Sequence, residues 1–390
     1  MLIHGPRQSG KTTLARSVGE PRGYQYISFD DEAAVAAANG DPIGFARRLP
    51  GKAILDEVQR VPRIFAALKS SIDERRTAGR FILTGSANVL FVPGLSDSLA
   101  GRMGILRLHP LSQAELENRR PNFIDALFRG RFPAAIGERL DAALAGRIVA
   151  GGYPAALARR SAGRRRAWYR DYVETQIQRD VRDLARIHSL DAMPRLLAVA
   201  ATQTARIINV ADLAAPFEMT RQTINDYVTL LERVFLLDAL PAWHSNRLSR
   251  LVKRPKLHIA DTGVACALLG VDAKSLDADR DMFGSMLETF VLQELRRQAS
   301  WHPDPPGFHH FRDRDGYEVD IVLERGLALA GIEVKAASSV STSDLRGLRK
   351  LRDAAGKRFA AGVVLYDGSS TINFGDRLHA VPIARLWRTS

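Results

Sequence analysis

The sequence is poor in cysteine and lysine and contains no long apolar run. Its one cysteine, Cys266, excludes an internal disulfide and a metal site built from several thiolates. No apolar run reaches about 18 residues and no signal peptide is recognisable, so we expect a soluble, cytoplasmic protein with no membrane partner. The 390 residues are 46% hydrophobic, which is enough to bury roughly two or three separate cores.

Acidic residues are in the minority. The chain has 43 Asp and Glu against 56 Lys and Arg, which gives a formal net charge of +13 and a pI near 10.2. A surplus of positive charge attracts polyanions, so nucleic acid, DNA in particular, is the expected partner. Because arginine dominates this surplus, the lysines at positions 11 and 335 stand out as places where a compact ammonium suits the chemistry better than a planar guanidinium.

The first residues contain a complete phosphate-binding loop. Residues 5–12 read Gly-Pro-Arg-Gln-Ser-Gly-Lys-Thr. Its glycines allow backbone N–H groups to point at phosphate oxygens, Lys11 can reach the β- and γ-phosphates, and the Thr12 hydroxyl can bind Mg²⁺. A helix that begins at Lys11 directs its positive dipole end at the anion. We therefore predict that ATP and Mg²⁺ bind through Gly5, Pro6, Arg7, Gln8, Ser9, Gly10, Lys11, Thr12 and Thr13.

A second motif is an apolar strand, residues 53–57, that ends in two carboxylates. Asp56 can accept a hydrogen bond from Mg²⁺-bound water, and Glu57 can orient or deprotonate the water that attacks the γ-phosphate. A further apolar strand leads to Thr84 and Ser86, either of which is a candidate sensor of that phosphate. The alternative is a strand that merely ends in an acidic turn. The upstream phosphate-binding loop favours the catalytic interpretation, which predicts an ATPase.

Short apolar segments alternate with helical ones in the first hundred residues. The predicted strands are residues 24–29, 53–58, 80–85 and 103–108. This alternation predicts a parallel, doubly wound sheet, which binds ligands at the carboxyl ends of its strands. Only four residues precede the phosphate-binding loop, so either the gene begins upstream or the sheet accepts a short first strand.

A helical region rich in arginine follows, over roughly residues 136–204. Its arginines are interleaved with Trp168, Tyr169 and Tyr172. This combination suits phosphate contacts together with base stacking. A solvated helix with salt bridges is an equal alternative, because acidic residues alternate with the arginines. Those acidic residues are Asp171, Glu174, Asp180 and Asp183.

Residues 208–260 are predicted to form a winged helix. A short helix precedes a second one, which Thr220 caps. The outward face of the second helix suits a DNA major groove; its residues are Arg221, Gln222 and Asn225. The loop between the two wing strands is basic, and carries Arg247, Arg250, Lys253 and Arg254. Winged helices also bind proteins, so a protein partner is the alternative.

Two adjacent strands near the C terminus carry charged residues between apolar ones. Side chains two positions apart share a strand face, so Asp320 can converge with Glu333 and Lys335. Such a set predicts a second Mg²⁺ site, in which the lysine stabilises a hydroxide or the developing charge, and Glu288 can add a carboxylate. The alternative is a Glu–Lys salt bridge at the end of the sheet. Charges on an apolar face are costly unless paired or metal-bound, which favours the site.

The chain resembles, over nearly its whole length, a large family of prokaryotic ATP-binding proteins of mostly unassigned function. The motifs that carry this resemblance are residues 5–14, 55–59, 83–86, 99–102, 152–154, 261–263 and 333–335. The family implies an α/β fold with a P-loop NTPase (ASCE/AAA-type) parallel sheet, a helical and winged-helix region, and a restriction-endonuclease-like domain of the PD-(D/E)xK type. The corresponding boundaries are 1–118, 119–205, 206–272 and 273–390.

The resemblance also implies that Arg102 is an arginine finger or a sensor. A finger that acts in trans needs a neighbouring subunit, which is compatible with a homo-oligomer. Two hypotheses follow. The protein is an ATPase that binds DNA and cuts it at the Asp320, Glu333 and Lys335 site, or it is a nucleotide-switched regulatory or interaction module whose nuclease-like domain does not cleave, in a defence or toxin–antitoxin setting.

Overall fold

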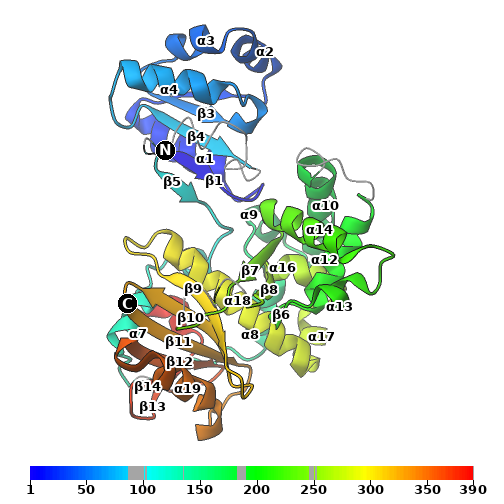
Figure 1. Cartoon of the computed structure of the whole chain (residues 1–390), viewed down its shortest axis with the longest axis vertical. Coiled ribbons are helices and arrows are strands. Elements are labelled where there is room, and N and C mark those ends of the chain that lie inside the picture. The colour runs from blue at the N-terminus through cyan, green and yellow to red at the C-terminus, as the bar shows by residue number, and fades with distance from the viewer. Residues whose placement is uncertain are drawn as a thin grey trace. The chain divides into compact units, whose positions relative to one another are not determined.

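The computed structural model describes residues 1–86, 101, 103–134, 136–181, 190–245, 250 and 253–389 (Figure 1). The chain forms two compact units, Met1–Pro110 with Arg233–Phe235, and Leu111–Glu232 with Leu236–Ser390. Two residues given a role above, Arg102 and Arg247, lie outside the described ranges. Within those ranges, every helix is too short or too polar to cross a lipid bilayer.

The first unit contains a five-stranded parallel sheet with the strand order β2-β3-β4-β1-β5. The strands are β1 (Leu2–His4), β2 (Gln25–Ser28), β3 (Ala53–Asp56), β4 (Phe81–Gly85) and β5 (Ile105–Arg107). The predicted parallel α/β arrangement is therefore confirmed. Because β4 lies between β1 and β3, the loop after β1 and the acidic residues after β3 flank its carboxyl end.

Helices cover both faces of this sheet, since successive apolar side chains of a strand point to opposite faces. Leu2, Leu55 and Leu83 join the core cluster of one face. The helices that contribute to that cluster are α2 (Glu32–Gly40), α3 (Pro42–Arg48) and α4 (Ile64–Glu74). The alternate residues Ile3, Ile54 and Ile82 pack against α1 (Lys11–Gly19) instead. In Figure 1 these helices lie on either side of β1, β3 and β4.

The second unit begins with helices, as predicted. They are α6 (Gln113–Leu116), α7 (Phe123–Arg129), α8 (Ala142–Ala150), α9 (Pro154–Leu157), α10 (Ala162–Gln176) and α12 (Ala192–Thr202). Tyr169 and Tyr172 are buried beside Tyr153, whose hydroxyl lies 3.1 Å from that of Tyr172. Trp168 stacks on Tyr172 with ring centroids 5.2 Å apart. Rings buried in a core cannot stack on bases, so the stacking role predicted for Tyr169 and Tyr172 is wrong.

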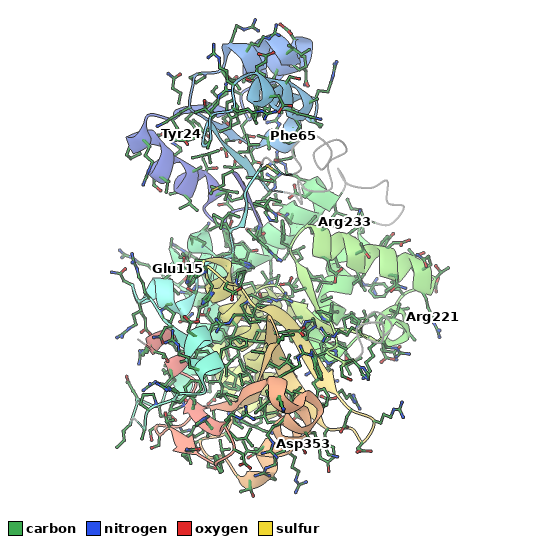
Figure 2. All side chains as sticks on the ribbon, turned by 60° about the vertical axis from the view of Figure 1, so that its left-hand side comes forward. Tyr24, Phe65, Glu115, Arg221, Arg233 and Asp353 are labelled. Carbon is green, nitrogen blue, oxygen red and sulfur yellow. The ribbon has the colours of Figure 1, made fainter. Side chains whose placement is uncertain are left out.

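The next segment combines short helices with a three-stranded antiparallel sheet of order β6-β8-β7. Its elements are β6 (Arg206–Ile207), α13 (Val210–Ala214), α14 (Arg221–Arg233), β7 (Leu237–Leu240) and β8 (Lys256–Ile259). The Thr220 hydroxyl accepts a hydrogen bond from the N–H of Thr223 at 3.1 Å, which confirms the predicted cap. Arg221 is exposed at the far end of α14 from Arg233 (Figure 2).

Two basic residues of the loop between β7 and β8 have partners within the protein. The Arg250 guanidinium binds both carboxylate oxygens of Glu324, at 2.6 and 3.3 Å, and the Lys253 ammonium donates to the carbonyl of Arg312 at 3.2 Å. Glu324 and Arg312 belong to the C-terminal sheet. Arg250 lies between β7 and β8, as predicted, but its guanidinium is engaged in a bidentate ion pair within the protein; its contact with DNA stays a prediction.

The C-terminal part is a mixed sheet of order β13-β14-β12-β11-β10-β9. Its strands are β9 (Gly307–Arg312), β10 (Glu318–Arg325), β11 (Ala328–Lys335), β12 (Phe359–Tyr366), β13 (Ile372–Asn373) and β14 (Leu378–Pro382). The helices α18 (Arg280–Ser300), α19 (Arg346–Ala355) and α20 (Arg385–Arg388) pack against this sheet, whereas α16 (Thr262–Leu269) and α17 (Ala273–Ala278) pack against the preceding helices, α8 among them. Cys266 is buried in α16, as its apolar surroundings predict.

Candidate nucleotide-binding site

The phosphate-binding loop follows β1 and ends at the first turn of α1. Gly5 has a φ of 149°, and a Cβ at this position would lie 2.1 Å from the carbonyl oxygen of Leu108, so only glycine fits. Gly10, with a φ of 95°, precedes the first residue of α1. The two glycines thus turn the chain so that the N-terminal N–H groups of α1 face the loop, where they favour an anion.

The side chain of Lys11 is held by the loop itself. Its ammonium donates to the carbonyl oxygens of Pro6 at 2.7 Å and Gly5 at 3.1 Å, and only 5% of the residue is exposed. The Ser9 hydroxyl donates to the same Pro6 carbonyl at 2.9 Å. These contacts fix a positive charge within the loop, as a site for the β- and γ-phosphates requires.

The carboxylate of Asp56 is surrounded by hydroxyl groups. Thr12 Oγ1 lies 3.0 Å from both carboxylate oxygens, the Tyr26 hydroxyl donates at 2.7 Å, and Thr84 donates from β4. Asp56 is 3% exposed, and Thr84 is fully buried. The structure therefore brings together Thr12 of α1, Asp56 at the end of β3 and Thr84 of β4. A hydroxyl beside a carboxylate is a set of hard oxygen donors that fits Mg²⁺.

Glu57 turns away from Asp56. Its φ of 58° lies in the left-handed region, which costs roughly 1–2 kcal/mol for a residue with a Cβ. The Ser86 hydroxyl donates to Glu57 Oε2 at 2.9 Å, and the Gln59 amide donates to the same oxygen and, at 3.1 Å, to Ser86. Glu57 is thus held by two donors on the side of Ser86, while Asp56 keeps Thr84 as its partner.

Two residues of this site escaped the sequence argument. Tyr26 lies on the neighbouring strand β2, and nothing in its sequence surroundings identifies a partner 30 residues away. Burial, followed by the hydrogen bond to Asp56, raises the pKa of Tyr26, so its hydroxyl stays protonated as a donor. Gln59 stands two residues after Glu57, and the positive φ of Glu57 brings its amide back to the carboxylate. That backbone turn is not visible in the sequence.

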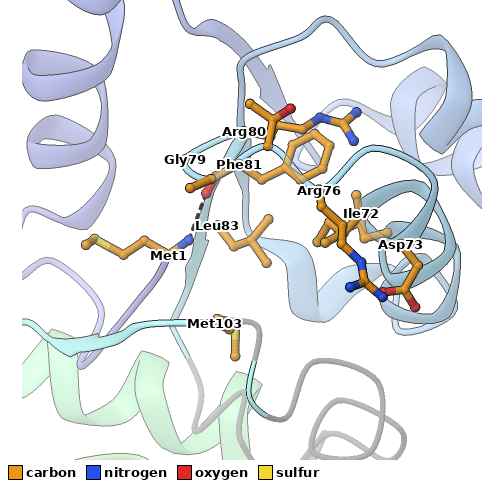
Figure 3. A pocket seen from close by; sticks show the side chains of 12 residues that line it. Met1, Ile72, Asp73, Arg76, Gly79, Arg80, Phe81, Leu83 and Met103 are labelled. Carbon is orange, nitrogen blue, oxygen red and sulfur yellow. Dashed lines mark hydrogen bonds between the residues drawn. The ribbon is translucent and has the colours of Figure 1, made fainter.

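A separate cavity of about 430 Å³ opens in the first unit (Figure 3). It is lined by apolar residues such as Leu68 and Phe81 and by Asp73 and Arg76. Met1 precedes β1 and Phe81 begins β4, and both line the cavity. The Met1 amine donates to the carbonyl of Phe81 at 2.8 Å. The cavity therefore lies at the amino ends of these strands, opposite the phosphate-binding loop, and is not part of the nucleotide site.

The second predicted site does not assemble as a metal centre. The ammonium of Lys256 lies 2.9 Å from Glu288 and 3.2 Å from Asp320. The ammonium of Lys335 lies 3.5 Å from Asp344. Among the described residues, no group of three or more His, Cys, Asp or Glu side chains is arranged to hold a metal ion. The geometry thus gives no support to the metal role predicted for Glu288, Asp320 and Glu333.

Comparison with known families divides the chain in three. Residues 1–117 match the family described as "AAA domain", residues 141–275 match "Domain of unknown function (DUF8612)", and residues 283–386 match "Domain of unknown function (DUF4143)". The chain therefore begins with an AAA-type P-loop domain. The four predicted domain boundaries stay a prediction.

Two mycobacterial proteins and one archaeal structure are similar to this chain. The uncharacterized proteins Rv2008c of Mycobacterium tuberculosis and Mb2031c of Mycobacterium bovis are each 28% identical over 391 residues, which cover 100% of this chain and 81% of theirs. The Walker-type ATPase PABY2304 of Pyrococcus abyssi is 14% identical, with a TM-score of 0.41, over 69% of this chain and 90% of that one. This score is too low to establish a common overall structure.

Proposed function

We propose that the protein is a Mg²⁺-dependent ATPase that binds DNA through its second unit. The observation that carries the ATPase proposal is the contact between Thr12 and Asp56, 44 residues apart, beside a loop that fixes the Lys11 ammonium. A hydroxyl, a carboxylate and an ammonium then face the place where a triphosphate would sit. The match of residues 1–117 to the AAA domain supports the same proposal.

Each residue has a distinct role in this proposal. Lys11 binds the β- and γ-phosphates, while Thr12 and Asp56 hold Mg²⁺, which supplies charge neutralisation on the phosphates. Glu57 orients the attacking water and accepts its proton, and it needs to be within hydrogen-bond reach of that water. Ser86 and Gln59 hold the Glu57 carboxylate. Thr84 and Ser86 remain the proposed sensors, and the role of Arg102 stays a prediction.

The DNA-binding part of the proposal concerns α14. The order α12, β6, α13, α14, β7 and β8, with a small antiparallel sheet, is typical of a winged helix. Ile224, Tyr227 and Leu231 bury one face of α14, and its exposed residues include Arg221, Gln222 and Asn225. An exposed polar face on a second helix, in a chain with a net charge of +13, suits a DNA groove. The alternative is that this face binds a protein partner, in which case the purified protein should not bind duplex DNA.

Titration calorimetry with ATP and Mg²⁺ tests the nucleotide site. Lys11→Ala should abolish binding, because the charge inside the loop is lost, whereas Lys52→Ala should bind like the parent. Lys52 is exposed before β3, at the amino end of that strand. Equal affinity of the parent and Lys11→Ala would rule out the proposed site.

Fluorescence anisotropy with duplex DNA at two salt concentrations tests the proposed DNA binding. An affinity that does not change with ionic strength counts against it.

A further inference from the structure

A buried lysine stands at the centre of the acidic cluster in the C-terminal part. Lys256 begins β8, and its side chain is 3% exposed. Its ammonium contacts Glu288 of α18 at 2.9 Å, Asp320 of β10 at 3.2 Å and Glu318 of β10 at 4.0 Å. Three elements separated by 32 to 64 residues therefore meet at one ammonium group.

Both carboxylate oxygens of Asp320 already have partners. Asp320 Oδ1 accepts from Lys256, and Asp320 Oδ2 accepts from the N–H of Val334 at 2.9 Å. A divalent cation needs several oxygen ligands at about 2.0–2.6 Å around a common centre. Here the ammonium occupies the position between Glu288 and Asp320, so a metal ion does not fit unless Lys256 leaves.

Strand β8 is held against α18, which keeps the lysine in place. His258 lies two residues after Lys256, on the same strand face, and its Nδ1 is 3.1 Å from the hydroxyl of Thr289. The amide of Gln293 donates to the carbonyl of Ile259 at 3.3 Å. These two hydrogen bonds connect the second half of β8 to α18.

The ion pairs compensate the charges that meet at Lys256. Its buried ammonium lies 2.9 Å from Glu288 and 3.2 Å from Asp320, so this positive charge has partners of opposite sign on two different elements. A buried charge is stable only when it is compensated in this way.

We infer that Lys256 is the resident cation between Glu288 and Asp320, and that it fastens the three-stranded sheet to the C-terminal sheet. The carboxylates of Glu288 and Asp320 then serve as an internal ion-pair site. This inference does not depend on the proposed ATPase activity.

Electron paramagnetic resonance with Mn²⁺ tests whether the centre takes a metal. The measurement uses full-length protein that carries Asp56→Asn, which weakens Mn²⁺ binding at the nucleotide site, and it contains no nucleotide. With Lys256 intact, we expect the protein to bind the same amount of Mn²⁺ whether or not it also carries Asp320→Asn. Mn²⁺ binding that disappears on Asp320→Asn would overturn the inference, and this arm requires no change at Lys256.

Lys256→Met tests the ion pair itself. Methionine keeps the length of the stem but leaves Glu288 and Asp320 buried without a cation, so the melting temperature should fall by roughly 10 °C. Adding Glu288→Gln should recover part of that loss. Lys350→Met is the matched control, because Lys350 forms an exposed ion pair with Asp315 at 3.4 Å and should change little. A Lys256→Met protein as stable as the parent would contradict the inference.

Discussion

Replacing Gln59 with leucine tests how the proposed catalytic carboxylate is held. The Gln59 amide donates to Glu57 and, at 3.1 Å, to Ser86, whereas leucine fills similar space without a donor. A hydrogen bond to a charged group contributes about 1.5–3 kcal/mol. If that bond keeps Glu57 where it meets the attacking water, its loss raises the barrier by a similar amount, which corresponds to a decrease in kcat of roughly 10- to 150-fold.

Steady-state phosphate release with Mg²⁺ and ATP, combined with calorimetry, separates this effect from a loss of binding. The Kd for ATP should stay near the parent value, because the hydrogen bonds of Gln59 run to Glu57 and Ser86 and not to the phosphate-binding loop. Gln178→Leu is the control, since Gln178 is exposed and donates to Glu174 at 3.1 Å in the second unit. A kcat within twofold of the parent would refute the positioning role of Gln59, and a parallel loss of ATP affinity would show that the variant disturbs the whole site.

Three further outcomes are expected. Glu57→Gln should bind ATP normally but hydrolyse it on the order of a hundredfold more slowly, since an amide cannot accept the proton of water; equal turnover would remove Glu57 from the mechanism. Arg221→Ala should weaken duplex binding and lower the slope of log affinity against log salt by about 1, while an unchanged slope would place DNA elsewhere. Burial, followed by Asp238, raises the pKa of Glu232 to about 7. The folded state therefore keeps a proton that the unfolded chain releases, and stability falls as pH rises from about 4.5 to 7. Glu232→Gln should thus gain up to about 3 kcal/mol on the parent between pH 5 and pH 8 in urea unfolding, and an identical pH profile for the two proteins would contradict this.

The predictions that succeeded concern local signals. Apolar runs located the strands of the first sheet, and the glycines of the phosphate-binding loop placed that loop at the start of α1. Thr220 marked the start of α14 because a cap is a contact between residues three positions apart. Spacing along one helix or strand determines such features, so they can be derived from the sequence.

The features that were missed depend on contacts between distant segments. Tyr26 reaches Asp56 from a neighbouring strand, and Arg250 reaches Glu324 over 74 residues. Tyr169 and Tyr172 lie on a helix rich in arginine, yet their rings face the core beside Tyr153. In each case the type of the residue is visible in the sequence, but its role depends on which residue it contacts. Sequence spacing carries no information about partners of this kind.

The two acidic motifs show why the partner decides the chemistry. Asp56 accepts hydrogen bonds from three neutral hydroxyl groups, so its carboxylate and the Thr12 hydroxyl together offer oxygen donors to a cation. Asp320 instead faces the ammonium of Lys256, which neutralises the carboxylate and occupies the space between it and Glu288. A buried charge is stable only when it is compensated. The first centre therefore suits Mg²⁺, whereas in the second an ammonium group already fills the space between Glu288 and Asp320.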